Sequence, residues 1–216
     1  MGKASRILKP ASRINRDAFA QAVKTVTIAT SPRPLQDCQV VAYTARNALK
    51  RLGVSAQIAA GYAAWRVDER DAGSIVAHHP NIQATVAGKY EGAIVMDGHC
   101  WLSLNSSILD FSTFQLAYKL RELDKFDGRN SAINWNPDYL WIDRAETISL
   151  ERVINGFKTG AYYEAIPKLL DVWESRPPTV DGATDAVIEV YRLMLNDNID
   201  QVVVSGQCGE LYQKAA

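Results

Sequence analysis

A cysteine, a histidine and an aspartate occur in this order in the sequence, at places where chemistry can be built. Cys38 begins a segment with helical spacing, His99 precedes a short apolar run, and Asp110 ends the next one. A thiol becomes a good nucleophile when an imidazole takes its proton, and a carboxylate fixes the tautomer of that imidazole. These residue types indicate attack of a thiolate on a carbonyl, provided that the three side chains meet.

The position of Cys38 favours the thiolate form. Asp37 is a suitable N-cap for a helix that ends near Leu52 and Gly53, so Cys38 falls in the first turn of that helix. The free backbone N–H groups and the dipole at a helix start lower the pKa of a thiol. The same N–H groups are suited to hold an oxyanion while a carbonyl is attacked.

A short hairpin is predicted to bring His99 and Asp110 together. If Asn105 and Ser106 form a two-residue turn, Asp110 lies opposite Trp101 and diagonal to His99. Side chains alternate along a strand, so His99 and Trp101 share one face with Asp110. A slip of one residue would turn Asp110 to the other face, so the prediction depends on this register.

The rest of the chain predicts helices around a central antiparallel sheet, which is an α+β pattern. Helical spacing covers residues 17–23 and 37–52, then 113–123, 149–173 and 184–195. Short strands are expected at residues 55–65, 81–88, 92–96, 100–104 and 107–111, and residues 134–143 read as a loop or an edge strand.

The composition is that of a soluble globular protein without a strong electric field. The 216 residues are 47% hydrophobic and 22% charged, and 24 basic residues balance 24 acidic ones. We therefore expect no nucleic acid and no membrane as partners. No apolar export segment follows the N-terminus, and three widely spaced cysteines form no zinc pattern, so a cytoplasmic protein with reduced thiols is expected.

Three further features are expected to be structural. The neighbouring pair His78 and His79 points to opposite sides of a strand, so we expect no metal there, and no cofactor motif is present. Cys100 follows His99 directly and is therefore expected to face the core. Gly61 is expected to allow close approach of another backbone.

Two stretches resemble the core of transglutaminase-like proteins, within the papain-like cysteine enzymes. The first runs from Cys38 through a helix and Leu52-Gly53-Val54 to Gly61-Tyr62, and the second is His99-Cys100-Trp101 followed by Asp110-Phe111-Ser112. The chain looks most like a small bacterial family without an assigned activity. The resemblance implies a papain-like fold, with a nucleophile-bearing helix packed on a central antiparallel sheet and extra C-terminal helices.

The domain prediction follows the extent of this resemblance. We expect a single domain over residues 1–216, with a catalytic-core-like segment at 35–112 and a helical C-terminal extension at 149–216. Residue by residue, the resemblance makes Cys38 the nucleophile, His99 the base and Asp110 its orienting group.

The oxyanion hole and the substrate contacts depart from the family pattern. A papain-type glutamine would stand six residues before the cysteine, where this chain has Pro32, and Gln39 replaces the tryptophan common beside the cysteine. Gln36, Trp101 and Trp135 are the weaker candidates for oxyanion or substrate contacts.

Three functions of different classes compete at this stage. The first is a cysteine-dependent amide hydrolase or acyl transferase, such as a cysteine peptidase, amidase or transglutaminase-like enzyme, which forms an acyl-enzyme on a peptide, amide or acyl small molecule. The second is a catalytically inert binding or scaffold protein, which predicts a buried Cys38 or a His99 that faces away. The third is an acetyl-CoA-dependent N-acetyltransferase of the same fold. The sequence leaves open whether the chain forms a homo-oligomer.

Overall fold

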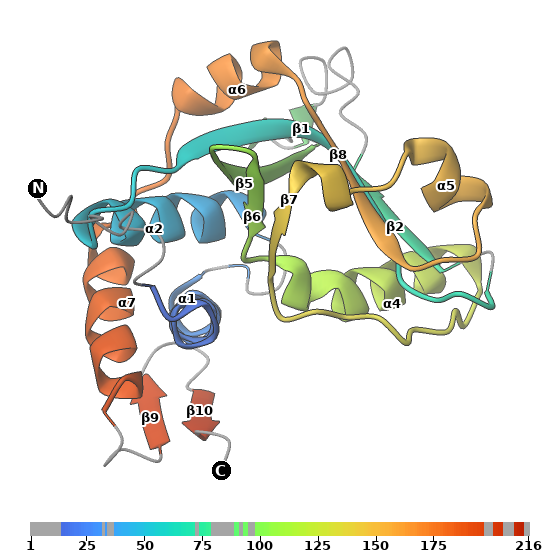
Figure 1. Ribbon diagram of the computed structural model, residues 1–216. Helices are drawn as coiled ribbons and strands as arrows, with labels where there is room; N and C mark the ends of the chain where they lie inside the picture. Colours follow the sequence, from blue (N-terminus) through green and yellow to red (C-terminus); the bar gives the residue numbers. More distant parts are fainter. Residues whose placement is uncertain are drawn as a thin grey trace, which may run out of the picture.

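A curled antiparallel sheet with helices on both faces forms the frame of the protein (Figure 1). The computed structural model describes residues 14–31, 33, 37–71, 74–78, 89–90, 93–94, 98–196, 201–204 and 210–213. Its helices are α1 Arg16–Thr30, α2 Cys38–Arg51, η2 Thr113–Gln115, α4 Leu116–Asp127, η3 Arg144–Glu146, α5 Leu150–Asn155, α6 Pro167–Glu174 and α7 Asp181–Met194. The main sheet contains β1 Gln57–Arg66, β2 Ile75–His78, β5 His99–Leu104, β6 Ser107–Asp110, β7 Leu140–Asp143 and β8 Gly160–Ala165. Two small hairpins lie outside it, β3 Lys89–Tyr90 with β4 Ala93–Ile94 and β9 Gln201–Val204 with β10 Glu210–Gln213.

The long strand β1 organises the sheet, because three strands pair with it. It pairs with β5 over its first half, with β2 near its end, and with β8 along the same second half. Gly61 pairs with both β5 and β8, and Ala63 pairs with both β2 and β8. A strand residue can pair on only two sides, and β8 occupies one side of β1. Therefore β2 and β5 both pair with the other side of β1, one after the other along its length. The end of β2 therefore lies next to the start of β5.

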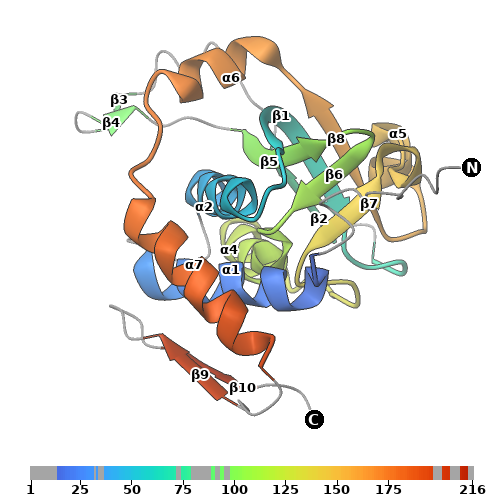
Figure 2. The ribbon, with the colours of Figure 1, turned by 60° about the vertical axis from the view of Figure 1, so that its left-hand side comes forward.

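The two faces of the sheet bury different helices. One face, with Ile58, Ala60 and Leu102, packs against α1, α2, α6 and α7. The other face, with Trp65 and Trp101, packs against Leu116 and Leu120 of α4. Figure 2 shows α7 crossing α1 on the side of the molecule that carries α2. The alternation of β1 thus supplies two separate cores, as the predicted α+β pattern requires.

The β5–β6 hairpin has the predicted register. Leu104 pairs with Ser107 across the turn, and Leu102 pairs with Leu109. Asn105 has a φ of 53°, a left-handed conformation that asparagine tolerates better than most residues, so the turn forms without glycine. The prediction that His99 and Asp110 share a face is confirmed.

The two N-terminal helices begin where the sequence predicts. The Asn15 side chain accepts from the backbone N–H of Ala18 and caps α1, and Asp37 accepts from Val40 and caps α2. α1 extends beyond the expected 17–23 to Thr30, because Phe19 and the small residues that follow it stay buried against α2 and α7. Cys38 is the first residue of α2, as expected.

The prediction of one helix over 149–173 is wrong. This stretch forms α5, the strand β8 and α6 in turn. Gly156 ends α5, and in β8 the buried Ala161 and Tyr163 alternate with more exposed neighbours, which is the period of a strand. Pro167 then begins α6. The segment 149–216 is therefore not purely helical, since β8 joins the main sheet.

The remaining strand predictions have mixed outcomes. Residues 134–143 end in the edge strand β7, and β4 falls within the expected 92–96. The sequence patterns did not predict β2, whose four residues alternate in burial. The expected strand at 81–88 lies outside the described residues. Within the described part of the chain, no helix combines the length and apolar character needed to cross a membrane.

Candidate functional site

His99 and Asp110 form the centre of the site. The Nε2 atom of His99 lies 2.7 Å from Oδ2 of Asp110, and both side chains are about 1% exposed. The charge of His99 and hydrogen bonds from Ser112 overcome the effect of burial and lower the pKa of Asp110 to about 2. The carboxylate is therefore ionised and accepts the Nε2–H bond, which leaves Nδ1 as the reactive nitrogen of the ring.

Asp110 is held by four hydrogen bonds. The backbone N–H and the hydroxyl of Ser112 donate to Oδ1 at 2.9 and 2.7 Å. The hydroxyl of Tyr163, from β8, donates to Oδ2 at 2.8 Å beside the His99 bond. Trp65 donates in turn to the Tyr163 oxygen at 3.0 Å. Each carboxylate oxygen thus has two donors, which fixes its orientation and satisfies a buried charge.

Cys38 meets His99 from the start of α2. Burial raises the pKa of the Cys38 thiol, but the charge of the neighbouring His99, the charge of Lys119 and the backbone of Cys100 help to lower it below its ordinary value of 9.0. Within the described residues, Nδ1 of His99 has no hydrogen-bond partner, so charge rather than a well-aligned hydrogen bond joins the pair. Catalytic hydrogen bonds often tighten only when substrate binds.

The charges of this group favour a thiolate–imidazolium pair. Burial opposes protonation of His99, but the charges of Asp110 and Cys38 outweigh it and raise the pKa of His99 to about 9. His99 is therefore protonated at neutral pH, and the proton comes from a thiol whose own pKa is lowered. Such a pair combines a nucleophile with a proton donor for a leaving group.

Aromatic rings enclose His99 on several sides. Trp101 stacks on it with centroids 6.0 Å apart, His78 stacks at 5.6 Å, and Trp65 meets it edge-on at 4.8 Å. Burial, followed by the charges of Lys119 and His99, lowers the pKa of His78 to about 2, so its ring is neutral. The cage fixes the plane of His99 and excludes water from its hydrogen bond to Asp110.

The weaker predicted contacts lie elsewhere. Trp101 is buried behind His99, so it supports the imidazole and presents no free surface. Trp135 packs beside Ile133 against the core between the sheet and α4, and no described contact joins it to Cys38. Gln36 lies outside the described residues. Cys100 is buried in the core on the other face of the sheet, which contains α2, as expected.

Sequence reasoning missed three residues of the site. Tyr163 was missed because residues 149–173 were predicted to form one helix, although the alternation in GAYYEA was a signal for a strand. Ser112 follows Asp110 by two residues, a spacing at which a serine commonly bonds the aspartate. No sequence signal identified Lys119, whose place beside Cys38 depends on how α4 packs.

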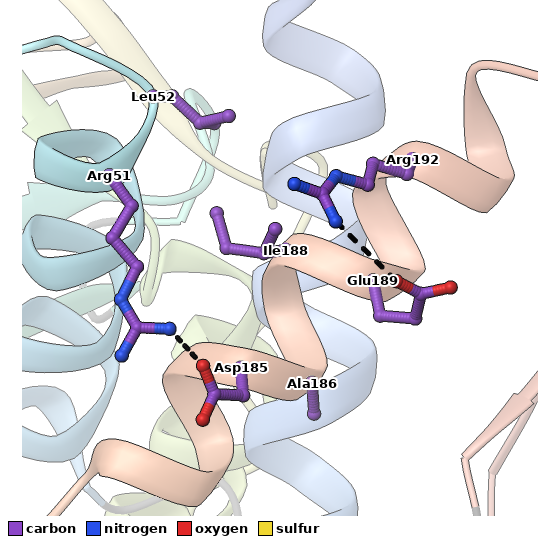
Figure 3. A pocket seen from close by; sticks show the side chains of 7 residues that line it. All are labelled: Arg51, Leu52, Asp185, Ala186, Ile188, Glu189 and Arg192. Atoms are coloured by element: carbon purple, nitrogen blue, oxygen red, sulfur yellow. Dashed lines mark hydrogen bonds and ion pairs between the residues drawn. The ribbon is translucent and has the colours of Figure 1, made fainter.

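A cavity of about 300 Å³ opens beside the site, between β2 and α4. Its lining includes His78, which stacks on His99, and Lys119, whose charge acts on Cys38. Another cavity, of about 520 Å³, lies at the other end of α2 (Figure 3). There Arg51 pairs with Asp185 and Arg192 lies 3.8 Å from Glu189. The second cavity is about 20 Å from Cys38 along the helix and takes no part in the site.

The described residues contain no cluster of three or more histidine, cysteine or acidic side chains that fits a metal ion. His78 is packed against His99, and its neighbour His79 lies outside the described part of the chain.

Comparison with known proteins supports the fold alone. No family model and no curated protein matches the sequence. Among solved structures, the chain is similar to "The crystal structure of genomics APC5867", with a TM-score of 0.51 and 12% sequence identity over 93% of this chain and 90% of that chain. The likeness extends over nearly the whole α+β architecture, and at this identity it carries no information about activity.

Proposed function

We propose that the protein is a cysteine-dependent amide hydrolase or acyl transferase that acts through an acyl-enzyme on Cys38. The observation that carries the proposal is the chain of interactions from Cys38 through His99 to Asp110: the charge of His99 acts on Cys38, and Nε2 of His99 lies 2.7 Å from the carboxylate. The start of α2, packed on an antiparallel sheet, agrees with the papain-like arrangement that the sequence resembles.

The reaction needs only the groups present in the site. The Cys38 sulfur attacks the carbonyl carbon, a C–S bond forms, and the carbonyl oxygen takes the negative charge. Cys38 is the first residue of its helix, so its backbone N–H has no acceptor within the helix and is suited to this oxyanion. When the C–N bond breaks, the imidazolium of His99 gives its proton to the leaving amine.

The second half of the reaction releases the acyl group. A water molecule, or an acceptor amine, gives a proton to His99 and attacks the thioester, and the Cys38 thiolate leaves. With water, the products are a carboxylic acid and an amine. Asp110 stays ionised throughout and holds His99 with Nδ1 toward the sulfur.

An acyl-enzyme trapping experiment tests the proposal. A small activated ester, 4-nitrophenyl acetate, is mixed with the protein, and intact mass spectrometry follows acetylation of Cys38. We expect rapid acetylation in the wild type and none at this position in Cys38→Ala. Cys100→Ala is the matched control, because that thiol is buried on the other face of β5. Equal acetylation of Cys38 and a free peptide thiol would contradict the proposal.

One observation favours an inert binding or scaffold protein instead. Cys38 is only 8% exposed and His99 is 1% exposed, as that alternative expects of a buried thiol. However, the inert alternative also allows for a His99 that faces away from Cys38, whereas the two side chains interact. Alkylation by iodoacetamide decides between them, because an inaccessible thiol reacts only at the rate of global unfolding.

A further inference from the structure

The cavity between β2 and α4 has the composition of a specificity pocket. Its walls are mostly apolar, with Val76 and Ala77 on one side and Leu123 and Phe126 on the other. α4 lies beside β2 over this region (Figure 1). A volume of about 300 Å³ is at the lower end of the range for small-molecule sites. It is suited to one apolar side chain with a polar group at the end near the triad.

Lys119 supplies the polar group at that end. It is the one lysine or arginine among the described residues that line the cavity, and no described ion pair includes it. Glu122, on the same wall, is paired with Lys125 at 2.5 Å. Burial lowers the pKa of Lys119 below its ordinary value of 10.5, and the negative charges of Cys38, Asp110 and Asp37 offset only part of this effect.

His78 connects the cavity to the reacting atoms. Its ring lines the cavity and stacks on His99 at 5.6 Å. Because β2 ends where β5 begins along the same edge of β1, this contact is fixed by strand pairing. A neutral His78 adds no cation of its own, so Lys119 is the cation that the cavity lining adds to the His99 imidazolium.

On the basis of the function proposed above, we infer that the substrate carries a carboxylate and an apolar side chain close to the scissile carbonyl. The apolar side chain occupies the cavity between β2 and α4, and the carboxylate pairs with Lys119. Acylated forms of large apolar amino acids, with a free carboxylate, are the simplest compounds of this class. Neutral amides of the same shape leave the Lys119 ammonium without its partner and bind less well.

Two alkylating reagents of nearly equal size test the role of Lys119. Iodoacetate and iodoacetamide attack the same thiolate, so the ratio of their rates does not depend on the fraction of Cys38 that is ionised. The imidazolium of His99 also attracts an anion, and the test is therefore the change in this ratio. In Lys119→Met we expect the iodoacetate-to-iodoacetamide ratio to fall about fivefold to tenfold.

Matched variants control for charge alone. Lys168→Met removes the same charge from an exposed position on α6, outside the cavity lining, and is expected to leave the ratio within twofold of the wild type. Lys119→Arg keeps the charge and is expected to do the same. An unchanged ratio in Lys119→Met, with iodoacetamide still fast, would overturn the inference but not the proposed function. Slow alkylation of wild-type Cys38 by both reagents would overturn both.

Protection of the wild-type protein tests the apolar part independently. N-acetyl-leucine, its neutral amide and N-acetylglycine are compared for their ability to slow alkylation of Cys38 by iodoacetamide. We expect N-acetyl-leucine to protect at a concentration about tenfold lower than the other two. Equal protection by all three compounds would refute the assignment of the cavity.

Discussion

Replacing Asp110 with asparagine removes one negative charge and leaves the size of the side chain unchanged. In the native protein this carboxylate accepts from His99 at 2.7 Å and from Tyr163 and Ser112 on its other sides. An amide at this position keeps part of the hydrogen bonding but no longer stabilises a charged imidazolium. We expect Asp110→Asn to fold and to lose the thiolate–imidazolium pair at neutral pH.

The size of the effect follows from the protonation of His99. The pKa of His99 is raised from 6.5 to about 9, and burial alone would lower it. This change in pKa is equivalent to about 3 kcal/mol of stabilisation of the protonated ring. Without the charge of Asp110 the imidazole is neutral at pH 7, and the proton stays on Cys38. The alkylation rate of Cys38 at pH 7 should then fall on the order of 100-fold.

The assay is the rate of iodoacetamide modification of Cys38 against pH, followed by peptide mass spectrometry. Asp124→Asn is the matched control, because Asp124 is also buried and accepts from the backbone and hydroxyl of a serine, Ser131. Asp124→Asn should leave the alkylation rate of Cys38 within twofold of the wild-type rate. A rate in Asp110→Asn equal to that of the wild type at pH 7 would refute the role assigned to the carboxylate.

Three further predictions concern the support of the site. Tyr163→Phe removes a donor to Asp110 and should lower the free energy of unfolding, measured in urea, by about 1–3 kcal/mol. In Cys38→Ser, which has no thiolate to titrate in the opposite direction, the His99–Asp110 ion pair should stabilise the fold most between about pH 4 and 6.5. As pH rises above this range His99 loses its proton, and as it falls toward 2 Asp110 gains one. Gly61→Ala places a Cβ 2.0 Å from the Glu164 carbonyl oxygen and should lower the free energy of unfolding by about 2–3 kcal/mol.

Each of these has an outcome that would count against it. Unchanged urea unfolding of Tyr163→Phe would mean that the hydroxyl bond adds nothing to the fold. In Cys38→Ser, where no thiolate titrates in the opposite direction, a flat dependence of unfolding free energy on pH between 6.5 and 9 would argue against a protonated His99. Gly182→Ala is the control for Gly61, because nothing lies within 4 Å of its added Cβ, and a change within about 1 kcal/mol is expected there.

Local sequence signals were sufficient to predict the contact between His99 and Asp110. A two-residue turn at Asn105 and Ser106 fixes the register of the β5–β6 hairpin, and the alternation of side chains then fixes the shared face. The cap at Asp37 likewise placed Cys38 at the start of its helix. Each inference depended on residues close together in the chain.

The contacts that join distant segments could not be predicted from the sequence. Tyr163 reaches Asp110 because β8 pairs with β1, and the pattern of residues 149–173 was read with the helical period instead of the strand period. The charge of Lys119 acts on Cys38 although α4 and α2 pack on opposite faces of the sheet, an arrangement that no local pattern specifies. The prediction for Trp101 identified a residue that stacks on His99, but its burial makes it a support for the imidazole.

The most direct test of the central claim is a titration of the Cys38 thiolate by its ultraviolet absorbance. The difference between the wild type and Cys38→Ser isolates this thiol from the other two, Cys100 and Cys208. We expect the thiolate signal of Cys38 to be present at pH 7 and to disappear only at a pH well below the ordinary thiol range, and His99→Ala should abolish the signal at pH 7. A Cys38 that ionises only near its ordinary pKa of 9.0 would contradict the activated nucleophile on which the proposed function depends.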